Sequence, residues 1–335
     1  MTLVAQRERD ASAPSDSRLE MTALLAGCGA YSLNRALISL TGQDRVRWLN
    51  GMVSNNVRDL AQGHGVYAFV LNAQGQIQGD LYIFNRGENL LLEIDRAQVE
   101  TLLPLLRRYI IMDKVEVEDL SDKLEEIGLA GPKSAEALAA LGLNSTDLAP
   151  LQFADKQWKV DITVVRGDNP CVPNYELWVA KEQAESLWNT LLAAGALEVK
   201  DDALETFRIL CGVPQIGRDI RERTLPQETG QERALSFTKG CYIGQEIVER
   251  IRARGSVHRA FVGFEVEGPP PSSGTKIQYE GKDVGEITSV ASAPLKQKRL
   301  ALGYLRKDAM LPDRTFAAGE ATLRAVSLPF SGIFD

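Results

Sequence analysis

The chain has 335 residues, of which 44% are apolar and 25% are charged, so it is long enough to bury a large core and predicts two or three domains. Its 45 acidic and 38 basic residues give a net charge of −7, which argues against a protein that mainly coats nucleic acid or anionic membrane. No stretch approaches the roughly 18 apolar residues of a membrane-spanning helix, and we expect a cytoplasmic protein.

The first 17 residues are predicted to be a disordered tail, because they combine charged residues with Ser, Ala and Pro and lack the apolar core of a secretory signal. The cysteines are widely spaced in the sequence, which indicates neither a zinc site nor a disulfide framework. They are Cys28, Cys171, Cys211 and Cys241. We therefore expect no metal.

The next hundred residues mix helices with antiparallel strands. Thr41-Gly-Gln-Asp44 matches a capping box, which predicts a helix from near residue 42. Val66–Leu71 and Ile77–Phe84 predict two strands joined by the turn residues Asn72-Ala-Gln-Gly75. A strand at 89–94, a helix at 96–110 and a strand at 114–118 are expected to follow.

The segment from 124 to 197 predicts a second α+β unit. A first strand is expected to precede a helix at 133–141, strands at 158–166 and 175–180, and a helix at 182–194. This order is close to a split β-α-β repeat, so we expect a ferredoxin-like domain.

The last third changes character along its length. Residues 201–210 predict a helix, and residues 212–235 predict a long loop, either ordered or disordered. After Gly255, short strands near 259–267, 276–280, 283–291 and 298–305 alternate with Gly and Pro turns, which is typical of a small sandwich or barrel.

The most unusual segment is Lys239-Gly-Cys-Tyr-Ile-Gly-Gln-Glu246. A helix is expected to begin near Gly244, which would place Cys241 just before a helix N-terminus with Lys239 nearby; both features favour a reactive thiolate. A buried cysteine with glycines needed only for the turn is an equally good interpretation. The residues alone leave both open.

This segment resembles the signature of the YgfZ family. The matching residues are Lys239, Gly240, Cys241, Tyr242, Gly244, Gln245 and Glu246, followed by Arg250, Arg254, Gly255 and Arg259. A weaker similarity to the wider glycine-cleavage T-protein family runs from about residue 20 to the end, through Asn50, Asn72, Asp80 and Arg208 among others.

The resemblance implies an α+β fold of two interlocked α+β domains, one of them ferredoxin-like, around a central folate channel, with a C-terminal β-barrel. The expected domains are 18–120 with 201–256 for folate binding, 121–200 for the ferredoxin-like unit, and 257–335 for the barrel. It also implies tetrahydrofolate or a one-carbon derivative as ligand, and iron–sulfur proteins or their assembly factors as partners. No membrane or specific nucleic acid is expected, and the oligomeric state is not indicated.

The resemblance assigns roles to particular residues. Asp80 is the first candidate for the pterin, since a carboxylate can meet its amidine-like edge with paired hydrogen bonds; a solvated strand-end carboxylate is the alternative. Arginines would suit the anionic glutamyl tail, although most such charge runs are simply solvated. The full set of expected folate contacts is Asp80, Asn72, Asn50, Arg208, Gln245, Glu246, Arg250 and Arg254.

Two positions depart from the transferase pattern. The T-protein usually has adjacent acids where this chain has Gly79-Asp80, and a glutamate where this chain has Leu210. The leading hypothesis is therefore a folate-binding accessory protein that supports iron–sulfur cluster assembly or repair, with Cys241 as the functional thiol. The alternatives are a folate-dependent aminomethyl or one-carbon transferase, with Asp80 as acid or base, and a ligand-free interaction protein. Whether the chain is an enzyme stays open at this stage.

Overall fold

The computed structural model describes residues 16–255, 257–295 and 297–331. The chain divides into two compact units, each described by itself. Unit 1 comprises Met1–Val70, Gly79–Lys200 and Thr238–Tyr242, and unit 2 comprises Leu71–Gln78, Asp201–Phe237 and Ile243–Asp335. The predicted tail lies outside the described residues up to position 15, whereas Ser17 already begins a helix.

Residues 35–119 form a five-stranded sheet and two helices. The strand order is β3 (Gly65–Leu71), β4 (Ile77–Asn85), β5 (Leu90–Asp95), β2 (Arg35–Thr41) and β6 (Glu116–Asp119). The helices are α3 (Arg45–Met52) and α4 (Arg96–Arg108). The apolar stripe predicted for α4 is buried through Leu102, Leu103 and Leu106, which confirms that helix.

The helix predicted near residue 42 begins later than expected. Thr41 is the last residue of β2, and Asp44 is the N-cap of α3 without a side-chain capping bond. The Asp44 carboxylate instead accepts a hydrogen bond of 2.9 Å from the amide of Lys114. The predicted capping box was therefore wrong, because the Asp44 side chain bonds to the distant Lys114 amide and makes no capping bond within its own helix.

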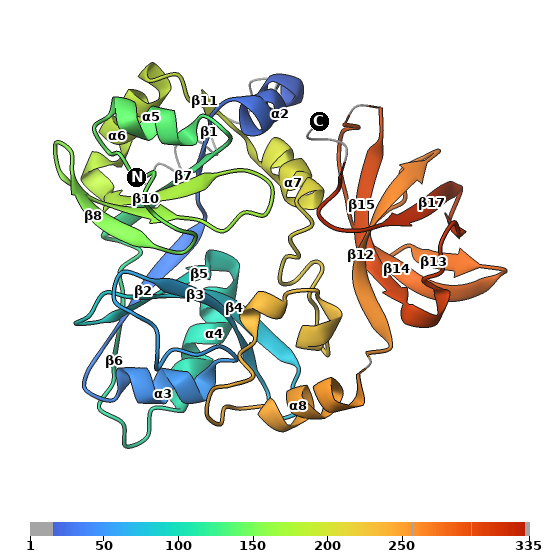
Figure 1. Cartoon of the computed structure of the whole chain (residues 1–335), viewed down its shortest axis with the longest axis horizontal. Coiled ribbons are helices and arrows are strands. Elements are labelled where there is room, and N and C mark those ends of the chain that lie inside the picture. Colours follow the sequence, from blue (N-terminus) through green and yellow to red (C-terminus); the bar gives the residue numbers. More distant parts are fainter. Residues whose placement is uncertain (1–15, 256, 296, 332–335) are drawn as a thin grey trace. The chain divides into compact units, whose positions relative to one another are not determined.

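A second, six-stranded sheet also lies in unit 1 (Figure 1). Its order is β11 (Leu197–Glu198), β1 (Gly29–Ser32), β7 (Leu124–Ala130), β10 (Asn174–Ala180), β9 (Asp161–Arg166) and β8 (Phe153–Gln157). Its helices are α2 (Ser17–Ala26), α5 (Ser134–Ala140) and α6 (Lys181–Ala193). The predicted α5 and α6 are confirmed, whereas the sequence patterns gave no sign of β1, β2 or β8.

The pairing of β1 bears on the predicted domains. β1 pairs antiparallel with β7 and parallel with β11, so residues 29–32 belong to the sheet that is otherwise built from residues 124–198. The domain boundaries at 120 and 200 remain untested. Residues 29–32, which were assigned to the folate-binding domain, nevertheless form part of the sheet of the expected ferredoxin-like domain.

The two sheets of unit 1 pack on each other. Leu37, Phe84 and Leu91 of the five-stranded sheet form one buried cluster with Phe153, Val165 and Trp178 of the six-stranded sheet. The rings of Phe84 and Trp178 meet edge to face, with centroids 5.1 Å apart. This contact brings the polar residues of β2, β4, β5, β7 and β10 close together.

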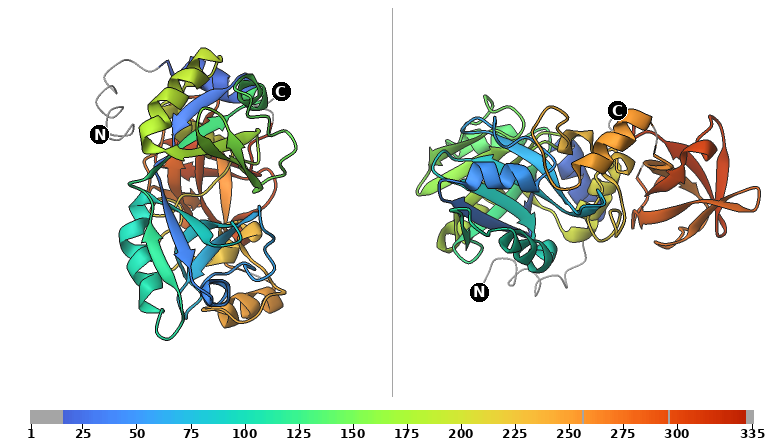
Figure 2. Two further views of the ribbon diagram at one scale, coloured as in Figure 1. Left: turned by 90° about the vertical axis from the view of Figure 1, so that its left-hand side faces the viewer. Right: turned by 90° about the horizontal axis from the view of Figure 1, so that it is seen from below.

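Unit 2 ends in a closed six-stranded barrel, drawn in orange to red in Figures 1 and 2. Its strands are β12 (Arg259–Glu267), β13 (Lys276–Tyr279), β14 (Lys282–Val290), β15 (Arg299–Arg306), β16 (Thr315–Ala318) and β17 (Ala321–Val326). The α+β class with a C-terminal barrel is thereby confirmed, and the inner faces of the strands form one apolar core.

The rest of unit 2 connects to this barrel through helices and an ordered loop. The helices are α7 (Asp201–Leu210) and α8 (Gln245–Arg254), with short 3-10 helices η1 (Pro226–Glu228), η2 (Glu232–Ala234) and η3 (Lys307–Ala309). The segment 212–235 is ordered, with backbone hydrogen bonds throughout the turn from Gln215 to Ile220.

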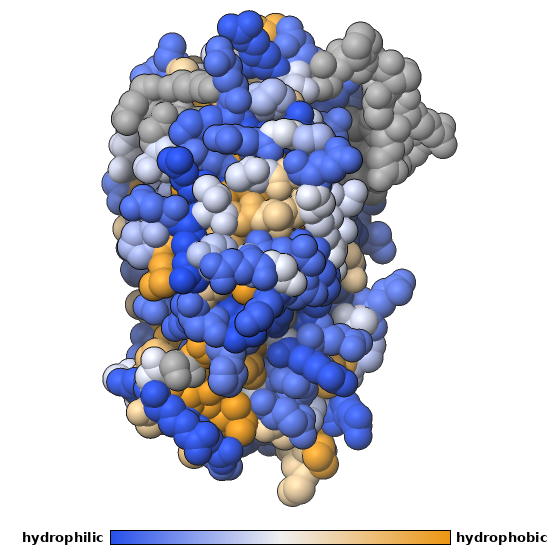
Figure 3. Space-filling model, turned by 90° about the vertical axis from the view of Figure 1, so that its right-hand side faces the viewer, coloured by the Kyte–Doolittle hydropathy of each residue, from blue (hydrophilic) through white to orange (hydrophobic). Residues whose placement is uncertain are grey.

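The surface agrees with the charged composition. The coloured face in Figure 3 is mainly hydrophilic, with hydrophobic residues in smaller areas. Among the described residues, no helix has both the length and the apolar character required to cross a membrane.

Candidate functional site

A group of charged side chains lies between the two sheets of unit 1. Arg35 of β2 forms an ion pair with Glu93 of β5, with 3.0 Å between Nε and Oε1. The Arg35 side chain is 24% exposed, whereas the Glu93 side chain is 1% exposed. The arginine therefore reaches from the surface into the core to meet a carboxylate that water does not reach.

Asp80 of β4 belongs to the same neighbourhood. The Tyr67 hydroxyl donates a hydrogen bond of 2.6 Å to one carboxylate oxygen, and the Gln98 amide donates one of 2.7 Å to the other. Gln98 Oε1 in turn accepts from the Asp80 backbone amide at 3.1 Å. The predicted pterin residue is thus a half-buried carboxylate held in a fixed orientation, rather than a solvated strand end.

The charges around Arg35 show how these groups are linked. Burial alone would lower the pKa of Arg35, but the nearby negative charges, first that of Glu93, outweigh it and raise the pKa. The other contributors are Tyr82, Asp80 and Glu176. Arg35 therefore connects the Asp80 group with a cluster of glutamates.

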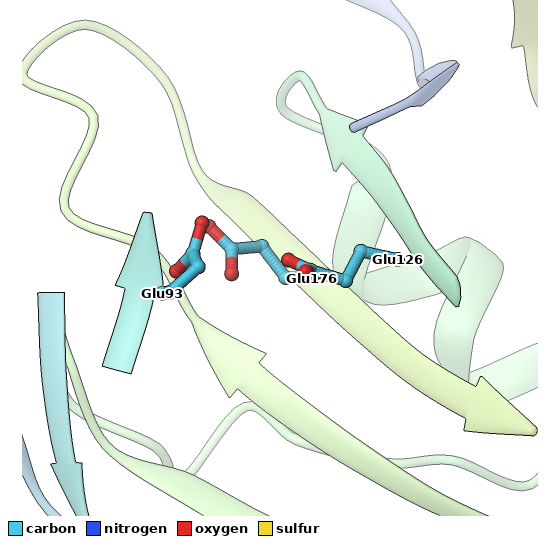
Figure 4. A group of neighbouring side chains, drawn as sticks. All are labelled: Glu93, Glu126 and Glu176. Carbon is cyan, nitrogen blue, oxygen red and sulfur yellow. The ribbon is translucent and has the colours of Figure 1, made fainter. Parts of the chain in front are cut away.

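This cluster consists of Glu93, Glu126 of β7 and Glu176 of β10, shown in Figure 4. One ligand oxygen from each lies within 4.8 Å of the others, a spacing that would let them share protons or one cation. Burial raises the pKa of all three carboxyls, well above the ordinary value for Glu126 and Glu176, and mutual repulsion adds to the shift of those two.

The glutamates have few polar partners. Both carboxyl oxygens of Glu93 and Oε2 of Glu176 are buried without a hydrogen-bond partner among the described residues, and Arg35 Nε lies 3.0 Å from Glu93 Oε1. Glu126 Oε2 is buried without a hydrogen-bond partner in the part of the chain that the structure describes. The cluster is therefore a buried group of acids in which burial favours the protonated form.

The absence of a second acid beside Asp80 has a steric cause. A Cβ atom at Gly79 would collide with Leu102 and would lie 2.8 Å from Gln98 Oε1. Those two side chains belong to α4, and Gln98 is the residue that orients Asp80. A paired acid at position 79 would displace the packing that fixes the remaining one.

Sequence reasoning missed Arg35, Glu93, Glu126 and Glu176. A signal was present, because Glu93 interrupts the apolar run Leu90-Leu-Leu-Glu-Ile94 and Glu176 stands between Tyr175 and Leu177. An acid inside a buried strand needs a partner, which makes it a candidate for a functional role.

The segment with the predicted thiol lies in unit 1 and shows a clear division of exposure. Cys241 is exposed, so the buried-cysteine interpretation does not hold. Lys239 is 9% exposed, and its ammonium donates to the backbone carbonyls of Asn50, Val53 and Asn55 at 2.6 Å each. Burial, helped by the charge of Arg58, lowers the pKa of Lys239 to about 7.

Two predicted contacts, Asn50 and Asn72, hold turns in place. The Asn50 side chain accepts from the backbone amides of Val57 and Arg58, at 3.0 and 3.3 Å. In unit 2, the Asn72 side chain accepts from the amides of Gln74 and Gln76 at 3.0 Å each. Both asparagines use their acceptor to stabilise local backbone.

Arg208 of α7 is the centre of a network in unit 2. Its guanidinium donates to both carboxylate oxygens of Glu205, to Asp219 at 2.7 Å, to Ser289 at 2.8 Å and to the carbonyl of Val213. These contacts use all five donors of the group. A folate contact through Arg208 would require one of them to break.

The other predicted contacts lie on α8 in unit 2. Gly244 is the N-cap in the left-handed region, with φ of 83°, and Gly255 ends the helix, so the predicted start and end are confirmed. Glu246 pairs with Arg250 at 2.6 Å on the exposed face, and Arg254 is exposed in the last turn. Gln245 is the first helical residue.

Two family descriptions match the chain. The "GCVT N-terminal domain" matches residues 20–239, and the "Glycine cleavage T-protein C-terminal barrel domain" matches residues 259–330. The second match coincides with the closed barrel of β12–β17.

Individual proteins are similar at lower identity. "Putative transferase At1g60990, chloroplastic" of Arabidopsis thaliana is 28% identical over 84% of this chain, which spans only 66% of that protein. An "Aminomethyltransferase" of Thermus thermophilus is 28% identical over 86% of this chain and 82% of its own length.

A solved structure shares the fold. The glycine cleavage system aminomethyltransferase T from Bartonella henselae superposes with a TM-score of 0.84 at 20% identity. The superposition covers 95% of this chain and 89% of that one.

Proposed function

Because the chain belongs to the family of the GCVT N-terminal domain, whose match covers residues 20–239, we propose that it binds a reduced folate and takes part in the transfer of a one-carbon unit. Several of the similar proteins, among them that of Thermus thermophilus, bear the name aminomethyltransferase, which favours transfer chemistry over a purely accessory role. The ligand we propose is tetrahydrofolate or one of its one-carbon derivatives, and we place the protein in the cytoplasm.

The observation that carries this proposal is the oriented carboxylate of Asp80 beside the buried acid cluster. An amidine-like edge presents two parallel N–H donors, which one carboxylate can accept together. Asp80 is half-buried, so a ligand can reach it, whereas Glu93 and Oε2 of Glu176 are buried. We therefore assign the two N–H donors of the pterin edge to the Asp80 carboxylate, with Glu176 as a second acid nearby and Arg35 balancing the charge of Asp80.

The chemistry available to these residues is proton transfer. Burial and the charge of Glu93 raise the pKa of Glu176 well above the ordinary value, so it keeps its proton to higher pH than an exposed glutamate does. Asp80 is oriented by Tyr67 and Gln98, which fixes the direction in which it can give or take a proton. Bound folate would supply the carrier nitrogens, and the protein would supply orientation and protons.

Calorimetry with tetrahydrofolate tests the binding. We expect saturable binding by the parent protein and at least a tenfold weaker affinity for Asp80→Asn and Glu176→Gln, which corresponds to about 1.4 kcal/mol. Asp122→Asn, at an exposed position in unit 1, serves as the matched control and should bind like the parent. Equal binding by all variants would remove the two acids from the site, and no binding by the parent would favour the ligand-free interaction protein.

Turnover is tested separately. We expect tetrahydrofolate and a thiol-bound aminomethyl group, whose carbon is already at the oxidation level of formaldehyde, to give methylene-tetrahydrofolate with release of ammonia and the thiol. We expect this activity to be lost in Asp80→Asn. Binding without turnover across candidate aminomethyl donors would leave folate binding intact and exclude the transferase activity.

A second candidate function rests on Cys241. The match of Lys239–Glu246 to the YgfZ signature and the exposure of the thiol favour a folate-binding accessory protein that supports iron–sulfur cluster assembly or repair. Iron–sulfur proteins or their assembly factors would then be the partners. This role stays a prediction, since the names of the similar proteins favour a transferase.

Complementation distinguishes this second role. In cells that lack the native gene, Cys241→Ala should fail to restore iron–sulfur enzyme activities, whereas Cys171→Ala, at a half-buried cysteine of the same unit, should restore them. Full rescue by Cys241→Ala would exclude the thiol from the function.

A further inference from the structure

The side chain of Lys239 reaches the end of a helix that lies far away in the sequence. α3 ends at Met52, and the last carbonyls of a helix have no partner within it. Lys239 Nζ donates to the carbonyl of Asn50, in the last turn, and to that of Val53, the C-cap residue. The third bond goes to Asn55, just beyond the helix.

The number of donors and acceptors matches. An ammonium has three N–H donors, and three carbonyl oxygens lie 2.6 Å from Nζ. A cation at a helix C-terminus also meets the negative end of the helix dipole. Lys239 therefore caps α3 from a segment that lies 184 to 189 positions further along the chain.

A second contact holds the same short segment. The ring of Tyr242 lies over the ammonium, with 4.8 Å from Nζ to the ring centroid, and Tyr242 is 7% exposed. Gly240 and Cys241 lie between these two buried residues and are both exposed. Both ends of the segment are thus buried, and its middle faces solvent.

We infer that Lys239 is a positioning residue for Cys241: its ammonium ties Thr238–Tyr242 to the C-terminal end of α3 and thereby fixes where the thiol is presented. The inference concerns the loop alone and holds whether or not the protein binds folate. From the sequence, Lys239 was expected to favour the thiolate form of Cys241. In the structure its ammonium is bonded to backbone carbonyls, so we infer that it fixes the position of the thiol instead.

The competing explanation is that burial of the lysine stem and of Tyr242 holds the segment without the ammonium. Lys239→Met separates the two, because methionine keeps most of the apolar volume and loses all three donors. Lys239→Arg keeps a cation with donors. Lys133→Met, at an exposed lysine of the same unit, is the matched control.

The position of Cys241 is read with a nitroxide spin label on its sulfur, in a Cys171→Ser background, since the other two cysteines are buried. We expect a restricted spectrum for this background and for Lys133→Met, and a mobile one for Lys239→Met, with Lys239→Arg retaining part of the restriction. A restricted label in folded Lys239→Met would overturn the inference. If the label were as mobile in Lys239→Arg as in Lys239→Met, a cation at this position would not restrict the loop, and the inference would again be overturned.

A measurement on the unaltered protein covers the case in which Lys239→Met does not fold. Brief acetylation of lysines, followed by peptide mass spectrometry, should modify Lys239 at least tenfold more slowly than Lys133 once each rate is divided by the neutral fraction of that amine at the labelling pH, because Lys239 is buried and bonded. Comparable corrected rates at the two lysines would show that Nζ is free in solution and would overturn the inference.

Discussion

The hydroxyl of Tyr67 donates a hydrogen bond of 2.6 Å to the carboxylate of Asp80, across neighbouring strands of one sheet. Hydrogen bonds to charged groups contribute about 1.5–3 kcal/mol. Tyr67→Phe should therefore lower the free energy of unfolding by about that amount, and a double-mutant cycle with Asp80→Asn should give a coupling energy above about 0.5 kcal/mol. Urea denaturation measures both. Independent effects of the two changes would show that the bond does not form in solution.

The acid cluster predicts an unusual dependence of stability on pH. A glutamate in the unfolded chain has a pKa of about 4.3. Burial raises the pKa of Glu126 and Glu176 in the folded protein, so they stay protonated to higher pH. Between these values the unfolded state binds fewer protons, so the free energy of unfolding should fall as the pH rises.

Glu126→Gln removes one of these groups. We expect the decrease in unfolding free energy as the pH rises above about 4.3 to be smaller in this variant than in the parent. Glu100→Gln, at an exposed position on α4, should leave the decrease unchanged. The same slope in all three proteins would contradict the assigned protonation of the cluster.

The network around Arg208 predicts a large effect on unit 2. Arg208→Met would leave Asp219, whose side chain is 0% exposed, without its cation. Breaking a buried pair in this way costs about 3–5 kcal/mol. Arg306→Met breaks an exposed pair with Asp308 and should cost less than about 1 kcal/mol. Thermal unfolding compares the two, and equal losses would show that the Arg208 network is not buried.

Gly244 allows a direct test of close packing at the start of α8. Its φ is +83°, and a Cβ atom would lie 2.5 Å from the carbonyl oxygen of Asn72. Gly217 has the same φ, and a Cβ atom there would meet no described atom within 4 Å, so Gly217→Ala carries the backbone strain alone. We expect Gly244→Ala to lose at least about 1 kcal/mol more than Gly217→Ala. An equal loss would mean that the contact with the Asn72 turn relaxes without cost.

Much of the fold could be predicted because its signals are local. The β3–β4 hairpin follows from two apolar runs around Asn72-Ala-Gln-Gly75, and Gly75 adopts the positive φ that the turn requires. The glycines at 244 and 255 bound α8 as expected. β1 and β8 were missed because they are short and gain their stability from partners far along the chain.

The site was harder to predict for the same reason. Asp80 was found through the resemblance to the T-protein family, but its partner Gln98 lies on a helix that the sequence predicted only from its apolar stripe. The acids of the cluster come from three strands in two sheets, and only the packing of the sheets brings their oxygens within 4.8 Å of one another. Lys239 was assigned to the thiol by its position in the sequence, whereas its three bonds go to residues more than 180 positions away.

The place of β1 between β7 and β11 has a consequence for synthesis on the ribosome. Residues 29–32 emerge early, yet both of their neighbours, residues 124–130 and 197–198, emerge much later. Until then β1 exposes two unpaired edges, which is where strands from other molecules attach. About 100 residues must be synthesised after β1 before β7 can pair with it. During that time, a chaperone bound to residues 29–32 would protect the nascent chain from aggregation.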